Sequence, residues 1–292
     1  MGLDLPFCDL EKAKFAVVPV AFERTTSYMK GTKNGPNKLL EASRQVEFYD
    51  EELRREIAQA YGVATVPVLK PKPNAESKEF LLKTSAVVRE LAQAGKFVAT
   101  VGGEHTVTFA PVNAFKDLHK DLSILYIDAH ADLRDRYEGT PWNHACALRR
   151  SIEACQSVGG KARTSLVAIR NLDIEEARYI QDNSNLALFT AHDHRSLASS
   201  IARIVDHLGE HVYISVDLDG LDPSIMPGVG TPQPGGLLWY ETLDLLKEVF
   251  KKRKVVGVDL MELAPIKGQV VSEFTAAKLL YRIFGYAARG AE

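Results

Sequence analysis

The sequence has few cysteines, no long apolar run and no excess of charge of either sign. Its 292 residues include three cysteines, Cys8, Cys146 and Cys155, and no two of them form a CxxC or CxxxC pair. This sparse, odd count fits a reducing compartment better than a disulfide framework. No apolar run approaches the ~18 residues that cross a bilayer, and the first residues lack a basic segment followed by an apolar one. We therefore expect a cytoplasmic protein with no membrane partner.

The charge distribution gives no indication of a nucleic-acid partner. The net charge is −2, and Lys and Arg are spread along the chain, whereas a nucleic-acid-binding surface needs a clustered positive patch. The one basic run, residues 251–254, follows an amphipathic stretch from Leu243 to Phe250. It predicts a helix C-terminus, where cations are stabilised by the helix dipole.

Short β-branched runs alternate with helical segments along the chain, as in Ser77–Ala94, whose apolar residues recur at helical spacing and stop at Gly95. This alternation is typical of a parallel sheet that is covered on both faces. No Pro-, Gly- or Ser-rich linker divides the chain. We therefore predict one α/β domain over residues 1–292, with three α/β/α layers, a mainly parallel central sheet and a last helix from about Ser272 to Gly285. The predicted strands are Phe15–Val18, Phe97–Val101, Leu122–Ile127, Ser165–Ile169, Leu186–Thr190, Val212–Val216 and Val255–Val258.

Acidic and histidine residues directly follow four of these strands. The sequence GGEH follows the second strand, DAHAD the third, DLDGLD the sixth and DLME the seventh. In open parallel sheets, ligands bind outside the carboxyl ends of the strands. If the chain stays extended past each strand, alternation directs Asp128, His130 and Asp132 to one side, and Asp217 and Asp219 likewise.

Together with His105, these residues offer two imidazoles and four carboxylates. One metal ion needs fewer ligands from the protein, whereas two ions that share bridging carboxylates suit this number. Four carboxylates also balance the charge of two divalent ions, and a majority of oxygen ligands favours Mn²⁺ over Zn²⁺. The candidate metal ligands are His105, Asp128, His130, Asp132, Asp217 and Asp219.

Each of these motifs has a plainer interpretation when it is taken alone. An isolated Asp-x-His-x-Asp or Asp-x-Asp is more often a solvated turn than a metal site. Asp222 precedes Pro223 and is expected to be a turn residue. The segment His192-Asp193-His194 looks like a metal pair but has no partner motif, so a polar loop is favoured. The coincidence of three clusters at separate strand ends is what favours the metal site.

Several motifs resemble, in order and spacing, those of the ureohydrolases: the arginases, agmatinases and their relatives. They are GGEHT, DAHADLRD, NHA, SVDLDGLDPSIMPGVGTPQPGGL and VGVDLMELAP. TTSYMKGTKNGPNKLLEAS and AAKLLYRIFG also match, so the resemblance covers nearly the whole chain. It implies an arginase-like fold, two manganese ions per subunit and a homo-oligomer, commonly a trimer or hexamer. One ion would be held by His105, Asp128, Asp132 and Asp217, the other by Asp128, His130, Asp217 and Asp219.

The resemblance also implies residues for the chemistry. His144, in the loop YEGTPWNHA, matches the proton shuttle of the family. Glu262 matches the carboxylate that binds the guanidinium group of the substrate, although a structural salt bridge between Glu262 and Arg170 is an alternative. Trp142 and Asp173 are further candidate substrate-binding residues.

Two kinds of sequence feature bear on the substrate: a segment of arginases that is missing, and three positions at which the sequence departs from the family pattern. The Ser/Asn-rich segment with which arginases hold the amino-acid end is absent, and RDRYEGTPWNHA resembles the agmatinase branch instead. Met29-Lys30, however, stands where agmatinases often have Arg-Pro, and PIKGQVVSE replaces an Asp-containing run; both could alter substrate choice. Glu104 conservatively replaces a common Asp.

The favoured function is manganese-dependent hydrolysis of agmatine to putrescine and urea. Other guanidines remain alternatives: aminopropylagmatine-type polyamines, guanidinobutyrate and arginine. A deacetylase-like amide hydrolase with one Zn²⁺ needs only one His and two Asp, so the extra carboxylates would stay unexplained. A two-metal phosphoesterase also uses Asp-x-His, but no Gly-Asn-His follows here. A catalytically inactive, metal-stabilised scaffold is disfavoured because all six ligand positions and Glu262 are present.

Overall fold

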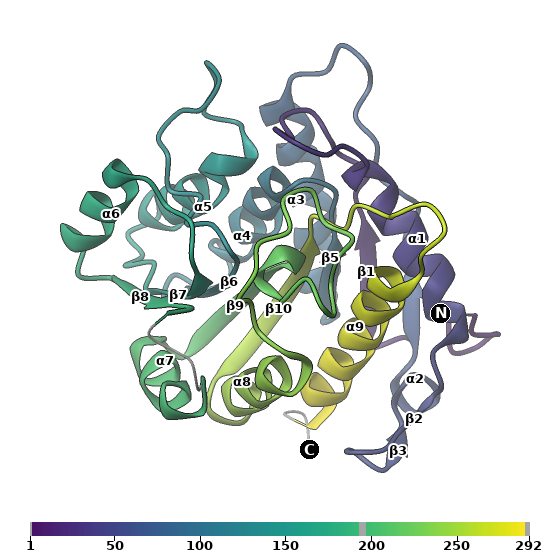
Figure 1. Cartoon of the computed structure of the whole chain (residues 1–292). Helices are drawn as coiled ribbons and strands as arrows, with labels where there is room; N and C mark the ends of the chain where they lie inside the picture. The colour runs from purple at the N-terminus through teal and green to yellow at the C-terminus, as the bar shows by residue number, and fades with distance from the viewer. Residues whose placement is uncertain (1, 193–196, 290–292) are drawn as a thin grey trace.

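The centre of the molecule is an eight-stranded sheet in the order β4-β1-β5-β10-β9-β6-β7-β8, whose neighbouring strands are all parallel. It is seen in a computed structural model that describes residues 2–192 and 197–289. Helices cover both faces of the sheet (Figure 1), as the alternating pattern predicts. The strands of this sheet are β1 (Phe15–Pro19), β4 (Val63–Thr65), β5 (Phe97–Val101), β6 (Ser123–Ile127), β7 (Thr164–Ile169), β8 (Leu186–Thr190), β9 (His211–Asp217) and β10 (Lys254–Met261).

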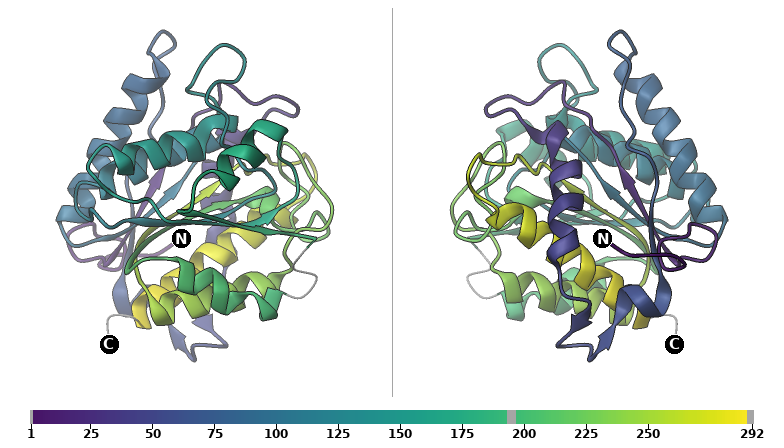
Figure 2. Two further views of the ribbon diagram at one scale, coloured as in Figure 1. Left: turned by 90° about the vertical axis from the view of Figure 1, so that its left-hand side faces the viewer. Right: turned by 90° about the vertical axis from the view of Figure 1, so that its right-hand side faces the viewer.

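Alternate residues of the inner strands pack into two separate cores, one on each face. In β1, Phe15 and Val17 belong to the core beneath α1, α2, α7, α8 and α9, whereas Ala16 and Val18 belong to the core beneath α3 to α6. Figure 2 shows the sheet between these two helical layers. The helices are α1 (Gly35–Ala42), α2 (Ile57–Tyr61), α3 (Ser77–Gln93), α4 (Phe109–Phe115), α5 (Ala147–Gln156), α6 (Ile174–Gln181), α7 (Ile201–His207), α8 (Trp239–Lys252) and α9 (Val271–Arg289).

The predicted elements are all present, with small differences at their ends. β5 and β8 have the predicted bounds, and α8 ends at Lys252 inside the basic run. β10 continues to Met261 and α9 to Arg289, each further than predicted. The short strand β4 and the hairpin of β2 (Tyr49–Asp50) and β3 (Arg55–Glu56) were not predicted. None of the described helices combines the length and apolar composition that crossing a membrane requires.

The four strands that carry the candidate motifs are neighbours in the sheet, although they are separated in the sequence. The chain leaves β5, skips two positions and forms β6; β9 and β10 later fill the gap between them. The carboxyl ends of β5, β10, β9 and β6 therefore lie side by side. Ligand sites in open parallel sheets lie at such an edge.

Two glycines allow the chain that leaves β5 to pass very close to its neighbours. A Cβ atom on Gly102 would lie 2.0 Å from the Sδ of Met261, and one on Gly103 would lie 1.9 Å from the carbonyl oxygen of Phe22. The carbonyl of Gly103 accepts a hydrogen bond of 2.8 Å from the backbone N–H of Glu262. A side chain on Gly102 would clash with Met261 at the end of β10, and one on Gly103 with the backbone of Phe22 in the segment after β1, so either would displace the GGEH loop.

Candidate metal centre and active site

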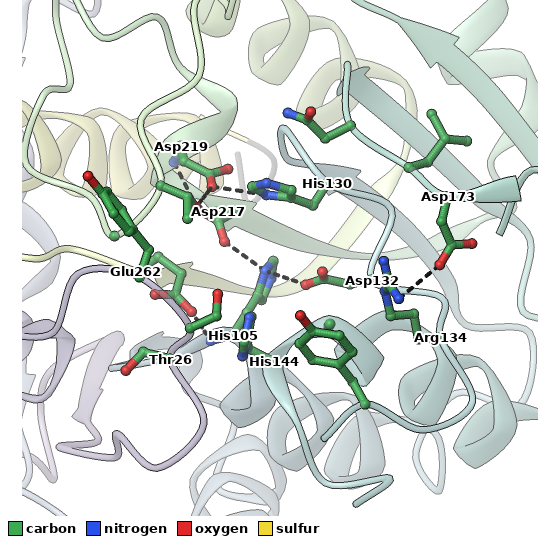
Figure 3. A pocket seen from close by; sticks show the side chains of 18 of the residues that line it. Thr26, His105, His130, Asp132, Arg134, His144, Asp173, Asp217, Asp219 and Glu262 are labelled. Atoms are coloured by element: carbon green, nitrogen blue, oxygen red, sulfur yellow. Dashed lines mark hydrogen bonds and ion pairs between the residues drawn. The ribbon is translucent and has the colours of Figure 1, made fainter. Parts of the chain in front are cut away.

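His105 lies at the centre of a group of carboxylates at the carboxyl edge of the sheet (Figure 3). Its Nδ1 atom is 3.0 Å from Asp128 Oδ2, 3.4 Å from Asp132 Oδ2 and 2.9 Å from Asp217 Oδ2. All four residues are buried. One ring nitrogen carries at most one proton, so it cannot satisfy three carboxylates by hydrogen bonding.

A second group forms around His130, and Asp128 belongs to both groups. The Nδ1 atom of His130 lies 3.5 Å from Asp128 Oδ1 and 3.1 Å from Asp219 Oδ2. The possible ligand atoms of Asp128, His130 and Asp219 lie within 4.8 Å of one another, as do those of His105, Asp128 and Asp132. Asp128 thus directs one carboxylate oxygen toward each imidazole.

The donor set and its electrostatics fit divalent cations. Asp128 Oδ2 is buried and has no hydrogen-bond partner among the described residues, an expensive state for a carboxylate unless a cation balances it. Burial opposes protonation of both imidazoles, but the surrounding carboxylates outweigh it: the pKa of His105 rises well above its usual range and that of His130 to about 12. The pKa of Asp217 is raised well above its usual range by burial and by the charges of Asp219 and Asp128. The cluster therefore strongly favours positive charge.

Among the six residues, Asp217 is the last residue of β9, and the other five lie in loops or 3₁₀-helices that follow the strands. β6 ends at Ile127, and Asp132 has a φ of 50° in the left-handed region, which is uncommon for a residue with a side chain. Asp219 lies in a 3₁₀-helix, Leu218–Gly220, that follows β9. The prediction that pleat alternation aligns these side chains is therefore wrong, although the structure does bring the six candidates together.

A buried polar network supports His105 from behind. Its Nε2 atom lies 3.0 Å from Ser215 Oγ, and Ser215 donates its hydroxyl proton to Asp259 Oδ1 at 2.8 Å. Tyr213 Oη donates to the other oxygen of Asp259 at 2.9 Å. Since the proton of Ser215 goes to Asp259, Ser215 accepts the Nε2–H of His105, and Nδ1 is the ring nitrogen that would offer a lone pair to a bound cation.

This supporting network was not identified from the sequence. The signal for it was present: polar residues interrupt the apolar strands β9 and β10 at Tyr213, Ser215 and Asp259. Such residues are rare in the middle of a buried strand unless they are hydrogen-bonded to one another.

A cavity of about 340 Å³ opens above the two groups. The loop 26–29, Tyr137 and Asn171 form part of its wall, and the sequence patterns did not assign them to it. The candidate ligands and chemical residues that line it are His105, His130, Asp132, His144, Asp217, Asp219 and Glu262.

Glu262 faces this cavity with a fixed carboxylate. It follows β10 with a φ of 64° and is 8% exposed, and its Oε1 accepts the backbone N–H of His105 at 2.7 Å. Burial and the neighbouring charge of Glu104 raise its pKa well above the usual range. Arg170 donates instead to three backbone carbonyls, and in the described part of the chain no Lys or Arg pairs with Glu262. The salt-bridge alternative is therefore wrong.

His144 begins a short 3₁₀-helix, His144–Cys146, at the cavity wall. Its Nδ1 atom is 3.2 Å from Thr25 Oγ1, and its ring stands edge-on to Tyr137 with the centroids 6.2 Å apart. A titratable imidazole is thus held at the cavity, on a different segment from the metal-binding candidates.

Two candidate substrate-binding residues have other partners. Trp142 packs edge-on against Phe109 with ring centroids 4.9 Å apart, and it is not among the described residues that line the cavity. Asp173 does line the cavity, but its carboxylate caps α6 and lies 3.0 Å from Arg134 Nη1. Direct contact of either residue with a substrate stays a prediction.

The turn interpretation of Asp222 is confirmed, because its carboxylate accepts backbone N–H groups from Ser224, Gly235 and Gly236. Asp193 and His194 of the possible metal pair lie outside the described residues.

Comparisons with known proteins agree with this architecture. A sequence profile of the arginase family matches residues 13–285. The N(1)-aminopropylagmatine ureohydrolase of Synechocystis sp. is 41% identical over 284 residues, 94% of this chain and 89% of that protein. The agmatinase of Pyrococcus horikoshii is 30% identical over 98% of this chain and 96% of that protein. The crystal structure of the agmatine ureohydrolase of Thermoplasma volcanium superposes with a TM-score of 0.84 at 28% identity, covering 98% of this chain and 96% of that one.

The parallel sheet with paired His/Asp groups at its carboxyl edge, together with these matches, defines a hydrolase of linear amidines. The chain belongs to the arginase family. It is an agmatinase-like ureohydrolase that acts on a guanidino compound.

The network behind His105 gives a testable prediction about metal affinity. Ser215→Ala removes the acceptor of the Nε2–H, so the orientation and tautomer of His105 are no longer fixed. We expect the dissociation constant for Mn²⁺ to rise by about 10- to 100-fold, as is usual when such supporting contacts are lost. Titration calorimetry on metal-stripped protein measures this.

Ser165→Ala is the matched control, because Ser165 is also a buried strand serine but donates to the carbonyl of Ile204, away from the cluster. It is expected to affect stability only. Equal losses of metal affinity in both variants would show that the network has no specific role in metal binding.

Proposed function

We propose that the cluster holds two manganese ions and that Asp128 and Asp217 would each help to hold both. His105 and Asp132 would complete one set of ligands, and His130 and Asp219 the other. The position of Asp128 carries this proposal, since its two carboxylate oxygens face different imidazoles. Carboxylates outnumber imidazoles two to one, which favours Mn²⁺ over Zn²⁺. When bound, the two ions supply Lewis acidity that lowers the pKa of a water molecule toward neutrality.

Glu262 would bind the guanidinium group of the substrate. Its Oε1 is held by the backbone of His105, so the carboxylate is oriented before substrate arrives. The nearby carboxylate of Glu104 adds negative charge. A guanidinium ion is planar and forms charge-assisted hydrogen bonds with such a carboxylate. These contacts would direct the guanidinium carbon toward the cluster.

His144 would transfer the proton that the reaction needs. Attack of water on the guanidinium carbon gives a tetrahedral intermediate, which breaks down when the amine nitrogen takes a proton as the C–N bond breaks. A histidine at the cavity wall is suited to deliver this proton. Urea and a free amine would leave.

The substrate we propose is a guanidino polyamine of the N(1)-aminopropylagmatine type. The sequence patterns favour agmatine. The polyamine is supported by the 41% identity to an N(1)-aminopropylagmatine ureohydrolase, compared with 30% to an agmatinase. The cavity also supports it, because Tyr28 and Met29 line it and are 74% and 46% exposed. An Arg at position 29 would repel a polycationic tail, whereas Met offers an apolar contact for its methylene groups.

We also propose that the protein forms a homo-oligomer, a trimer or hexamer. Three apolar residues at the start of α9 and just before it, Val270, Val271 and Phe274, are substantially exposed. Clustered exposed apolar side chains are typical of surfaces that contact another chain.

The role of Glu262 is tested by Glu262→Gln, which keeps the shape of the side chain but removes its charge. Manganese should stay bound, while kcat/KM should fall at least tenfold, equivalent to about 1.4 kcal/mol of transition-state stabilisation. Steady-state urea release and metal content measure the two effects. Glu241→Gln, the same change on α8 outside the cavity, should behave like the parent. Parental kcat/KM in Glu262→Gln, or loss of its manganese, would contradict the assigned role.

Substrate choice is tested by urea release from a panel of guanidines in the presence of Mn²⁺. N(1)-aminopropylagmatine should have a higher kcat/KM than agmatine, guanidinobutyrate or arginine. Met29→Arg should reduce kcat/KM for aminopropylagmatine more than for agmatine, because it places positive charge beside the longer cationic tail. If agmatine is the better substrate of the parent and Met29→Arg changes both rates equally, the polyamine assignment is wrong.

A further inference from the structure

The hydroxyl group of Thr25 joins a buried carboxylate to His144. Thr25 Oγ1 lies 2.7 Å from Glu104 Oε1 and 3.2 Å from His144 Nδ1. It also accepts the backbone N–H of His144 at 3.0 Å. Thr25 belongs to the segment after β1, Glu104 to the loop after β5 and His144 to the loop before α5. Three distant parts of the sequence therefore meet at one oxygen atom.

Glu104 acts in this arrangement as an acceptor of hydrogen bonds. It is completely buried, and its carboxylate also receives the backbone N–H groups of Arg24 and Thr25 and the hydroxyl of Thr106, the last at 2.7 Å. All of these partners can donate. A carboxylate that gathers so many donors is held rigidly, and its hydrogen bonds are stronger than those between neutral groups.

The single hydroxyl proton of Thr25 determines which ring nitrogen of His144 carries a proton. The hydroxyl has one proton, and the stronger charge-assisted bond to Glu104 takes it. The backbone N–H of His144 occupies one acceptor position on the oxygen. The remaining contact, to His144 Nδ1, is then a hydrogen bond in which Nδ1–H donates. Nε2 is left as the ring nitrogen that can gain or lose a proton.

We propose that Thr25 and Glu104 are positioning residues that hold His144 with its proton on Nδ1, so that Nε2 alone exchanges protons with the reacting groups. This inference rests on the proposed proton transfer by His144. Neither residue touches the substrate; Glu104 acts through Thr25, and Thr25 acts through the imidazole. Glu104, which conservatively replaces a common Asp, thus forms a specific hydrogen bond with Thr25.

Thr106 provides a matched control. Its hydroxyl donates to the same Oε1 atom of Glu104 at the same distance, 2.7 Å, as that of Thr25. Among the described contacts it does not reach His144. Thr25→Val and Thr106→Val therefore remove equivalent hydrogen bonds from Glu104, but only the first also frees the imidazole.

The experiment compares steady-state urea release by four single variants and one double variant of the manganese-loaded enzyme. Thr25→Val should lower kcat about tenfold with KM changed less than twofold, since general acid catalysis contributes about 10²–10⁴-fold and only part is lost. Thr25→Ser keeps the hydroxyl and should restore kcat. Thr106→Val should stay within about twofold of the parent. His144→Ala should lower kcat more than Thr25→Val, and Thr25→Val/His144→Ala should be no slower than His144→Ala, because the two residues act as one unit.

The outcomes separate this inference from the function on which it rests. Parental kcat in His144→Ala would overturn the proton-transfer role itself. A slow His144→Ala with a parental Thr25→Val would overturn only the positioning role. So would equal losses in Thr25→Val and Thr106→Val, or additive losses in the double variant. If Thr25→Val does not fold, Thr25→Ala removes the same hydroxyl without adding a methyl group and is judged by the same criteria.

Discussion

The arrangement of the site depends on one buried carboxylate, that of Asp128, placed between two imidazoles. It follows β6 directly, and β6 lies inside the sheet with a neighbour on each side. One of its oxygens faces His105 and has no hydrogen-bond partner among the described residues, while the other faces His130 and accepts its backbone N–H at 2.6 Å. Such a group is stable only where positive charge is supplied on both sides. The other ligands, the supporting residues and the cavity are arranged around this requirement.

Strands and loops contribute different residues to the surroundings of Asp128. Strands β9 and β10 carry the residues that orient His105, whereas the candidate ligands lie at the carboxyl ends of β5, β6 and β9 or in the segments that follow them. Asp132 and Glu262, both with positive φ, are held in conformations that cost of order 1–3 kcal/mol each. Tyr126 on β6 donates to Asp132 Oδ2 at 2.9 Å and stacks on the His105 ring. Contacts from the sheet thus stabilise the unusual loop conformations.

The sequence predicted the fold class, the positions of seven strands and the six candidate ligands, because each depends on a local pattern. Continuous apolar runs reveal strands that are buried on both faces, and β5 and β8 were found with their observed bounds. The three-residue strand β4 is too short to form such a pattern. The resemblance of their motifs to those of a known family also singled out Glu262 and His144, which both line the cavity; their roles stay predictions.

The contacts that orient these residues could not be predicted, since they join distant segments. Thr25 and His144 are 119 positions apart, and so no spacing in the sequence relates them. Asp132 reaches the cluster with its own backbone in the left-handed region. The alternation of side chains along an extended strand does not predict such a conformation. The residues that select the substrate also could not be placed from the sequence. Met29 was noted as differing from the family pattern, but only the fold places it on the wall of the cavity.

The sharing of Asp128 between two metal ions is tested most directly by counting the ions that the chain binds. Metal-stripped protein is titrated with Mn²⁺, freed of excess metal by gel filtration and analysed by mass spectrometry for manganese. The account predicts about two ions per chain in the parent, about two in Asp222→Asn, whose carboxylate only organises a turn, and at most one in Asp128→Asn. A parent that binds a single ion, or an Asp128→Asn variant that retains as much manganese as Asp222→Asn, would contradict it.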